Sequence, residues 1–310
     1  MSSSVDLHSI RDFERLDFLA RQVVEGFITG LHQSPYHGFS VEFAEHRLYN
    51  TGESTRHIDW KLYARTDKMF VKRYEEETNL RCQVVLDTSG SMLFPDPEGF
   101  SFEEPNKLAF SIYSAASLMN LLRRQRDAVG LTTINESLEL HTQAKTNRAH
   151  HHMLLTELSK LMRSPEQRKA THLAPQLHLL AERLHRRSLV VIFSDFLERA
   201  EEEGEELFEA LQHFRYNKHE LILFHVEDGK LERNFDFENR PHRFVDLESG
   251  EELKLHPETI KEEYREKRNA LIKEIELRCG RFKIDWVEAN IRNNYNQVLL
   301  PYLLKRRKLY

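Results

Sequence analysis

The stretch that decides the fold is Val84-Val85-Leu86-Asp87-Thr88-Ser89-Gly90-Ser91-Met92. A short, valine-rich apolar run of this kind is typical of a strand that is buried on both faces of a parallel sheet. Open α/β sheets place their ligand sites at the carboxyl ends of such strands. Asp87, Ser89 and Ser91 would then lie in one turn. One carboxylate and two hydroxyls suit Mg²⁺, which prefers about six oxygen ligands and keeps some of its waters.

Asp87-Thr88-Ser89-Gly90-Ser91 resembles the metal-ion-dependent adhesion site of von Willebrand factor A domains, whose motif is Asp-x-Ser-x-Ser. The resemblance implies an α/β fold with a doubly wound, mostly parallel sheet flanked by helices. It also implies that a threonine and a second aspartate from later loops complete a site for Mg²⁺, Mn²⁺ or Ca²⁺. The Asp-x-Val-Gly-Leu pattern of the same family has its counterpart at residues 127–131.

Two later residues fit the places that the resemblance requires. Thr171 precedes an apolar helical pattern, and its order in the chain favours a ligand, although a threonine at this point could instead be an ordinary helix N-cap. Asp195 follows the apolar run 189–194, and two parallel strands that end side by side would bring Asp87 and Asp195 to one edge of the sheet. A cation between two carboxylates relieves their repulsion, whereas Asp195 by itself could simply cap the next helix. The expected metal ligands are Asp87, Ser89, Ser91, Thr171 and Asp195.

Residues 1–78 are expected to form an N-terminal appendage to an A-like domain of residues 79–310. Apolar residues recur at helical spacing between Ile10 and Leu31, which predicts a helix that packs on the main domain. An exposed helix that binds a partner is the alternative. Short β segments should follow that helix, and a hairpin insertion is expected around residues 231–256. In the main domain we also expect a helix with Pro105 in its first turn and a strand over residues 282–287.

A second resemblance lies in the appendage, to the bacterial proteins labelled domain of unknown function fifty-eight. The matching elements are Glu42-Phe43, Arg47-Leu48-Tyr49, Gly52-Glu53, Arg56-His57-Ile58-Asp59-Trp60 and Ala64-Arg65. Glu53 stands where this family usually has aspartate. With the A-domain motif, the resemblance covers roughly residues 35–230. It implies a MoxR-type AAA+ ATPase as partner, the two acting as a chaperone or assembly machine.

The charged and aromatic residues of this signature allow two interpretations. They could form ion pairs that pin the segment to the sheet, because charges packed near aromatic rings commonly pair locally. They could instead form a partner surface, because arginine, tyrosine and tryptophan are frequent at binding hot spots. The candidate partner-binding residues are Arg47, Tyr49, Arg56, Asp59, Trp60 and Arg65.

Composition narrows the classes of partner. Lys and Arg number 45 against 50 Asp and Glu, and the net charge of -5 gives no general attraction to nucleic acid or anionic membrane. A basic cluster at residues 305–308 is a local exception. Cys82 and Cys279 are too few for a disulfide framework and suit buried, reduced thiols. No signal peptide and no apolar run of about 20 residues is recognisable, so we expect a cytoplasmic protein without an integral membrane segment.

The leading hypothesis is a non-enzymatic, metal-dependent binding or assembly module, an adaptor or co-chaperone whose ion is completed by a partner's carboxylate. The alternative is a metal-dependent, phosphatase-like hydrolase with Asp87 as nucleophile. Such a site would need Asp-x-Asp, and Ser89 occupies the place of the acid/base carboxylate. The chain has no Gly-x-x-x-x-Gly-Lys loop, so no ATPase activity of its own is expected. Consecutive helical residues point about 100° apart, so His150-His151-His152 should not converge on one ion.

Overall fold

The computed structural model describes residues 7–33, 46–48, 63, 65–66, 70–72, 80–96, 98–163, 173–196, 203–247 and 250–309. The chain divides into two compact units, one of residues 1–28 together with 80–310 and one of residues 29–79. The first 28 residues therefore group with the larger unit and not with the rest of the expected appendage. The boundary after Asn79 separates the smaller unit from the main part of the larger one.

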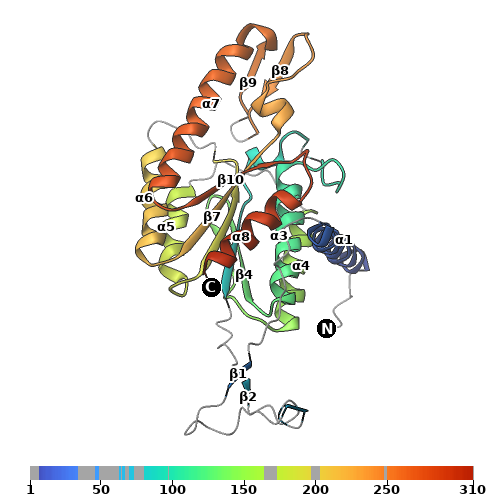
Figure 1. Ribbon diagram of the computed structural model, residues 1–310. Helices are drawn as coiled ribbons and strands as arrows, with labels where there is room; N and C mark the ends of the chain where they lie inside the picture. The colour runs from blue at the N-terminus through green and yellow to red at the C-terminus, as the bar shows by residue number, and fades with distance from the viewer. Residues whose placement is uncertain are drawn as a thin grey trace, which may run out of the picture. The chain divides into compact units, whose positions relative to one another are not determined.

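A six-stranded sheet forms the centre of the larger unit (Figure 1), in the order β10-β7-β6-β3-β4-β5. All neighbouring strands are parallel except β5, which pairs antiparallel with β4 at one edge. The chain adds β4 on one side of β3 and then β6 on the other, so the winding direction reverses between β3 and β6. The strands are β3 (Arg81–Asp87), β4 (Ala128–Ile134), β5 (Leu138–His141), β6 (Leu189–Ser194), β7 (Glu220–Glu227) and β10 (Asp285–Asn290).

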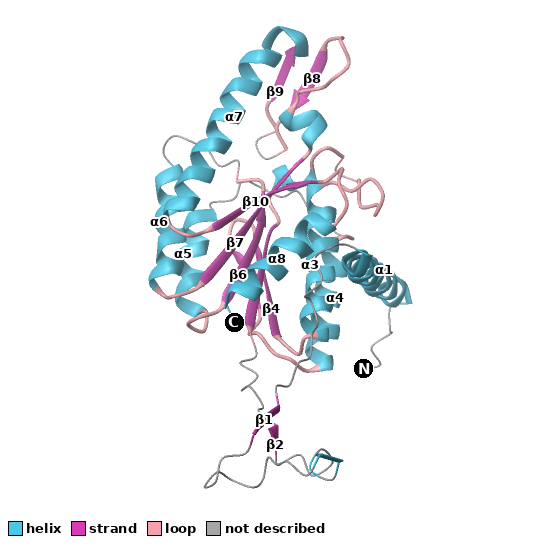
Figure 2. Cartoon of the chain, viewed as in Figure 1, coloured by secondary structure: helices cyan, strands magenta, loops and turns pink. Residues whose placement is uncertain are grey.

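Helices cover both faces of this sheet (Figure 2), which confirms the expectation of a doubly wound, mostly parallel α/β fold. On one face, α5 and α6 pack with the last turns of α7 in an apolar cluster that includes Leu177, Leu211 and Cys279. On the other face lie α3, α4 and α8. The helices are α3 (Lys107–Arg124), α4 (Arg148–Leu161), α5 (Leu173–Arg183), α6 (Glu203–Tyr216), α7 (Pro257–Arg281) and α8 (Asn296–Leu309).

Residues 7–28 of helix α1 (Leu7–Gln33) belong to the larger unit and contact α3 there. Its apolar stripe is buried at Leu16, Ala20, Val24 and Phe27. The Nδ2 group of Asn120 on α3 lies 3.4 Å from Oδ1 of Asp17, and Arg124 pairs with Glu25 at 2.9 Å. The interpretation of this segment as a helix that packs on the main domain is therefore confirmed for the part of α1 that belongs to that unit.

The core explains why β3 and β6 are the central strands. Every residue from Cys82 to Asp87 in β3 and from Leu189 to Ser194 in β6 is buried, as expected for strands covered on both faces. Helix α3 is buried along most of its length, and the buried hydroxyls of Ser111 and Ser117 donate within the helix, to the carbonyls of Lys107 and Tyr113, at 2.8 Å each.

Helix α3 begins slightly later than the sequence suggested. Pro105 was expected in its first turn, but the side chain of Asn106 accepts a hydrogen bond from the Ala109 amide at 2.8 Å. Asn106 is therefore the N-cap, and Lys107 is the first helical residue.

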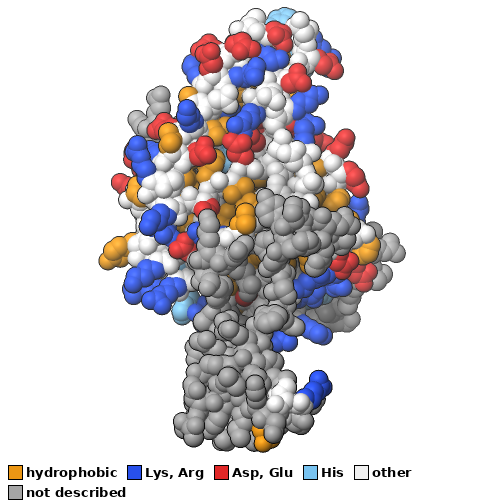
Figure 3. All heavy atoms as spheres, viewed as in Figure 1, with side chains coloured by type: hydrophobic (Ala, Val, Ile, Leu, Met, Phe, Trp, Pro, Cys, Tyr) orange, Lys and Arg blue, Asp and Glu red, His pale blue; other side chains and the backbone are white. Residues whose placement is uncertain are grey.

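Residues 229–281 build a projection beyond the sheet (Figure 1) from the π-helical turn η3 (Gly229–Arg233), the hairpin β8 (His242–Val245) and β9 (Glu252–Leu255), and the first turns of α7. Phe235 joins these parts, because its ring lies 5.7 Å from that of Phe244 on β8 and 4.5 Å from that of Tyr264 on α7. Figure 3 shows acidic and basic side chains intermingled over this projection. Helix α7 continues to Arg281, so the strand expected over residues 282–287 instead runs from Asp285 to Asn290.

In the smaller unit, β1 (His46–Leu48) pairs antiparallel with β2 (Phe70–Lys72), so both short β segments expected there are present. Within the described part of the chain, no helix is both long enough and apolar enough to cross a membrane.

Candidate functional site

The carboxyl ends of β3 and β6 lie side by side where the winding of the sheet reverses, the usual position of ligand sites in open α/β sheets. Asp87 is the last residue of β3, and Asp195 directly follows β6. The hydroxyl of Ser194 donates to Oδ2 of Asp87 at 2.6 Å, which joins the two strand ends. The structure thus confirms that the two strands end together, as the sequence predicted.

The turn after β3 brings the two serines of the motif together. The amide of Ser89 donates to Oδ1 of Asp87 at 2.9 Å, and the hydroxyl oxygens of Ser89 and Ser91 lie 3.0 Å apart. Thr88 anchors the turn to β4, because its amide and its hydroxyl both donate to the Ile134 carbonyl, at 2.8 and 2.9 Å. We call Asp87, Ser89, Ser91 and Asp195 the rim cluster.

The rim cluster is electrostatically unusual because its carboxylates are almost inaccessible, with Asp87 4% and Asp195 3% exposed. Burial, together with the charge of Asp195, raises the pKa of Asp87 to about 6. The hydrogen bonds from Ser194 and Ser89 oppose this rise because they stabilise the ionised form. A nearby cation would therefore have a buried carboxylate to neutralise.

Lys107 brings one positive charge to this cluster from the first turn of α3. Its side chain is 1% exposed, and Nζ lies 2.7 Å from Oδ2 of Asp195 and 2.7 Å from Oε1 of Glu232. Burial acts to lower the pKa of Lys107, but the two carboxylates outweigh it and raise that pKa above its ordinary value. Lys107 therefore carries a full charge inside the protein.

Glu232 connects this lysine to the projection. Its Oε2 accepts the amide of Asp228 at 2.8 Å, and Asp228 in turn caps η3 by accepting the amides of Lys230 and Leu231. Arg292 holds the Asp228 carboxylate with two hydrogen bonds of 2.7 Å. A chain of polar contacts thus runs from Asp195 through Lys107 to η3.

The sequence interpretation missed Lys107. A signal was available, because a cation in the first turn of a helix faces the positive end of the helix dipole and needs a compensating partner. The partners themselves could not be read from the sequence, since Glu232 lies 125 residues further along the chain.

The expected ligands divide into two groups. Asp87, Ser89, Ser91 and Asp195 come together as described, whereas Thr171 lies outside the described residues. In the described ranges, no three His, Cys, Asp or Glu side chains gather as a metal site would require, so a metal at the rim cluster would depend on hydroxyl oxygens. Metal binding at these residues stays a prediction.

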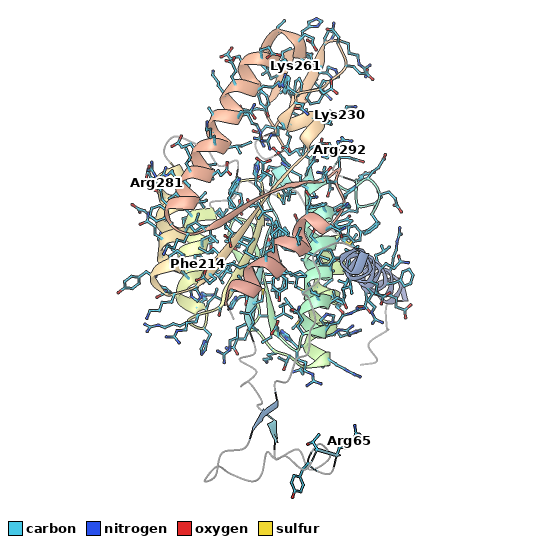
Figure 4. The ribbon with its side chains drawn as sticks, in the orientation of Figure 1. Arg65, Phe214, Lys230, Lys261, Arg281 and Arg292 are labelled. Carbon is cyan, nitrogen blue, oxygen red and sulfur yellow. The ribbon has the colours of Figure 1, made fainter. Side chains whose placement is uncertain are left out.

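The expected partner surface is described only in part. Arg47 lies in β1 and Arg65 is exposed in the smaller unit (Figure 4), whereas Tyr49, Arg56, Asp59 and Trp60 lie outside the described residues. Their role in binding stays a prediction.

The histidine run has a structural role at its first residue. A ring nitrogen of His150 lies 2.9 Å from the Val129 carbonyl, which fixes the start of α4 to β4.

The chain is weakly similar to several solved structures. BatB from Bacteroides thetaiotaomicron matches with a TM-score of 0.45 and 14% identity, over 74% of this chain and 100% of BatB. The SpRpn10 VWA domain matches with a TM-score of 0.33 and 13% identity, over 48% of this chain and 76% of that domain. The PilB minor pilin from Streptococcus sanguinis matches with a TM-score of 0.41 and 8% identity, over 77% and 64% of the two chains.

Among curated proteins, the uncharacterized proteins Rv1480 of Mycobacterium tuberculosis (strain ATCC 25618 / H37Rv) and Mb1516 of Mycobacterium bovis (strain ATCC BAA-935 / AF2122/97) are each 29% identical over 182 residues. The match covers 59% of this chain and 55% of each relative, so the chain spans about half the length of these relatives. The family model described as "Protein of unknown function DUF58" matches residues 45–274, which is more than half of the 310 residues. The chain therefore belongs to this family.

Proposed function

We propose that the chain is a non-enzymatic, metal-dependent protein-binding module. A divalent cation, Mg²⁺ or alternatively Mn²⁺ or Ca²⁺, would be held at the rim cluster and completed by a carboxylate from a protein partner. The observation that carries the proposal is the pair of serine oxygens, 3.0 Å apart, beside two buried aspartates where the sheet reverses its winding.

The distance between the serine oxygens suits this chemistry. Two neighbouring ligands of an octahedral ion at about 2.1 Å are separated by about 3.0 Å, the edge of the octahedron. The hydroxyl oxygens of Ser89 and Ser91 have this spacing. They would bind the cation directly, and Thr171 would supply a third hydroxyl.

The aspartates would act mainly through their charge. Both oxygens of Asp87 already accept hydrogen bonds, from the Ser89 amide and the Ser194 hydroxyl, which favours contact with the ion through a bound water. The same contacts leave Asp87 poorly placed to act as a nucleophile, and this supports a binding role over the phosphatase-like alternative.

Charge balance further supports a divalent ion. Asp195 and Glu232 share the single ammonium of Lys107, and the charge of Asp195 acts on the buried carboxylate of Asp87. A cation at the rim cluster would neutralise Asp87 and only part of the Asp195 charge. A divalent ion would therefore keep positive charge and stay attractive to an external Asp or Glu.

The partner is proposed from the family resemblance seen in the sequence. It would be a MoxR-type AAA+ ATPase, with this chain acting as adaptor or co-chaperone. The signature residues around Arg47 and Arg65 would provide a second contact surface.

Metal binding is tested by titrating Mn²⁺ into the purified chain and recording the free-ion signal by electron paramagnetic resonance. Asp87→Asn and Ser89→Ala should weaken binding by about tenfold or more, since even outer ligands of metal sites cost about 10–100-fold. Ser137→Ala, at an exposed serine outside the rim cluster, should bind as the unmodified chain does.

Partner binding is tested by retention of a purified MoxR-type ATPase on the immobilised chain, with Mg²⁺ and with chelator. Retention should require Mg²⁺ and be lost in Asp87→Asn. Equal retention with chelator, or unchanged Mn²⁺ affinity in both rim variants, would overturn the proposal.

A further inference from the structure

A pair of histidines lies away from the rim cluster, on the face covered by α5 and α6. The two helices run side by side (Figure 1) and share the apolar cluster that contains Leu177 and Leu211. The Nδ2 group of Asn217, just after α6, donates to the Ala181 carbonyl of α5 at 3.1 Å, so the spacing of the helices is fixed. Side chains on such rigid elements are held more accurately than side chains on loops.

His178 of α5 and His213 of α6 face each other across this contact. Both rings are partly exposed, their Nδ1 atoms are 3.2 Å apart, and their planes are inclined by 43°. Figure 4 labels Phe214, the next residue along α6. Without a metal, this distance requires one ring to carry its proton on Nδ1 and donate it to the other ring.

We propose that His178 and His213 form a binding site for a transition-metal ion of the Zn²⁺, Ni²⁺ and Cu²⁺ class, with both Nδ1 atoms as ligands. Imidazole nitrogens bind Zn²⁺ at about 2.0–2.1 Å. Two such nitrogens are about 3.3 Å apart when they bind at the tetrahedral angle that Zn²⁺ prefers. They are about 2.9 Å apart when they bind at the right angle of the square-planar geometry that Cu²⁺ or Ni²⁺ prefers. The observed 3.2 Å falls between these values, so the ion can enter after one proton moves from Nδ1 to Nε2.

The donor atoms decide the kind of ion. Neutral imidazole suits Zn²⁺, Cu²⁺ and Ni²⁺, whereas Mg²⁺ and Ca²⁺ select oxygen, so this pair would not compete for the ion of the rim cluster. No third His, Cys, Asp or Glu joins the pair in the described part of the chain. Water would fill the other coordination positions, and Cu²⁺ should bind more tightly than Zn²⁺.

The experiment uses the full chain, freed of any histidine tag, with excess Mg²⁺ to occupy hard-cation sites. Zn²⁺ and Cu²⁺ are titrated separately by isothermal calorimetry. One ion per chain should bind, and His178→Ala and His213→Ala should each lower the affinity by about tenfold or more, because removal of a ligand costs at least as much as removal of an outer partner.

Two matched variants separate this site from others. His256→Ala removes an exposed histidine at the start of α7 and should leave the Zn²⁺ affinity unchanged. Asp87→Asn should also leave it unchanged, so failure of this site and failure of the rim site are distinguishable. Circular dichroism confirms that each variant is folded. Zn²⁺ affinity that is the same in both histidine variants and in the unmodified chain, or that is lost in Asp87→Asn, would overturn the assignment.

Discussion

Replacing Lys107 with methionine would leave the carboxylates of Asp195 and Glu232 without the ammonium that bonds to both at 2.7 Å. Methionine has a similar length and suits a buried position, so the change removes charge with little change in volume. The perturbation therefore tests the ion pairs and not the packing of α3.

The expected magnitude follows from burial. The side chain of Lys107 is 1% exposed and those of its partners 4% and 10%, so solvent screens these contacts poorly. Breaking a buried pair by removing one partner costs about 3–5 kcal/mol because the remaining charge is uncompensated. For a chain of this size the midpoint of thermal unfolding should fall on the order of 10 °C, since each kcal/mol shifts it by about 2–4 °C.

Urea unfolding at neutral pH without divalent ions, followed by circular dichroism, measures the effect. Lys267→Met is the control, because Lys267 pairs with Glu263 on the surface with 77% of its side chain exposed. Exposed pairs contribute about 0–1 kcal/mol, so this variant should unfold almost as the unmodified chain does. Lys107→Met combined with Glu232→Gln should regain part of the loss, since one of the two carboxylates is then neutral.

A loss below about 1 kcal/mol in Lys107→Met would refute the reasoning, because it would place Lys107 among weakly coupled surface pairs. A loss of the expected size that the Glu232→Gln change does not reduce would show that packing, and not charge, dominates.

Three further predictions test other parts of the structure. Burial lowers the pKa of His225 to about 3, so as pH falls below about 6.5 this histidine binds a proton in the unfolded chain but not in the folded one. The free energy of unfolding should therefore fall by about 1.4 kcal/mol per pH unit. His225→Phe should flatten this slope in urea titrations from pH 7 to 5. Gly130→Ala places a Cβ 2.6 Å from the Thr142 carbonyl oxygen and should lower the free energy of unfolding by about 1–3 kcal/mol. Gly26→Ala, with open space around it in α1, should raise that free energy by up to about 1 kcal/mol. Equal effects of the two changes would refute this packing argument. Arg292→Ala should cost about 1–3 kcal/mol because it leaves the fully buried Asp228 without its paired donor, and Arg292→Lys should lose less; no change in the unfolding midpoint in either would contradict this.

The sequence could predict the centre of this fold because its strands carry their own signal. The apolar runs that end at Asp87 and Asp195 are long enough and rich enough in valine to specify buried parallel strands. Parallel strands that neighbour each other must end at the same edge, so the meeting of Asp87 with the end of β6 followed from strand type alone.

Element boundaries were less predictable because local capping contacts, of a side chain or of the backbone, set them. Asn106 delays the start of α3 to Lys107. Charged residues continue α7 to Arg281, and the backbone of Phe282 then ends the helix, which moves β10 three residues along the chain from the expected start. Charge patterns on an exposed helix carry no sharp signal for its last turn.

Polar pairs between residues far apart in the chain could not be predicted from the sequence. Lys107 meets Asp195 and Glu232 across 88 and 125 residues, and His178 meets His213 across 35. No local spacing encodes such pairs, since they depend on which helix ends at which strand. The sequence can identify Lys107 as a cation in the first turn of a helix, where the helix dipole is unfavourable to positive charge, but only the fold shows which carboxylates it pairs with.

The position of Lys107 bears on how the proposed module would respond to its ion. A divalent cation at Ser89 and Ser91 would attract Asp195, which now bonds to the ammonium of Lys107. Any weakening of that bond would strengthen the pairing of Lys107 with Oε1 of Glu232. Oε2 of Glu232 accepts a hydrogen bond from the amide of Asp228, which precedes η3. The same buried lysine would thus limit the negative charge that a bound ion meets, and it connects the rim cluster to the segment from which the hairpin and α7 project. An exposed lysine could do neither, because water would screen both carboxylates from it.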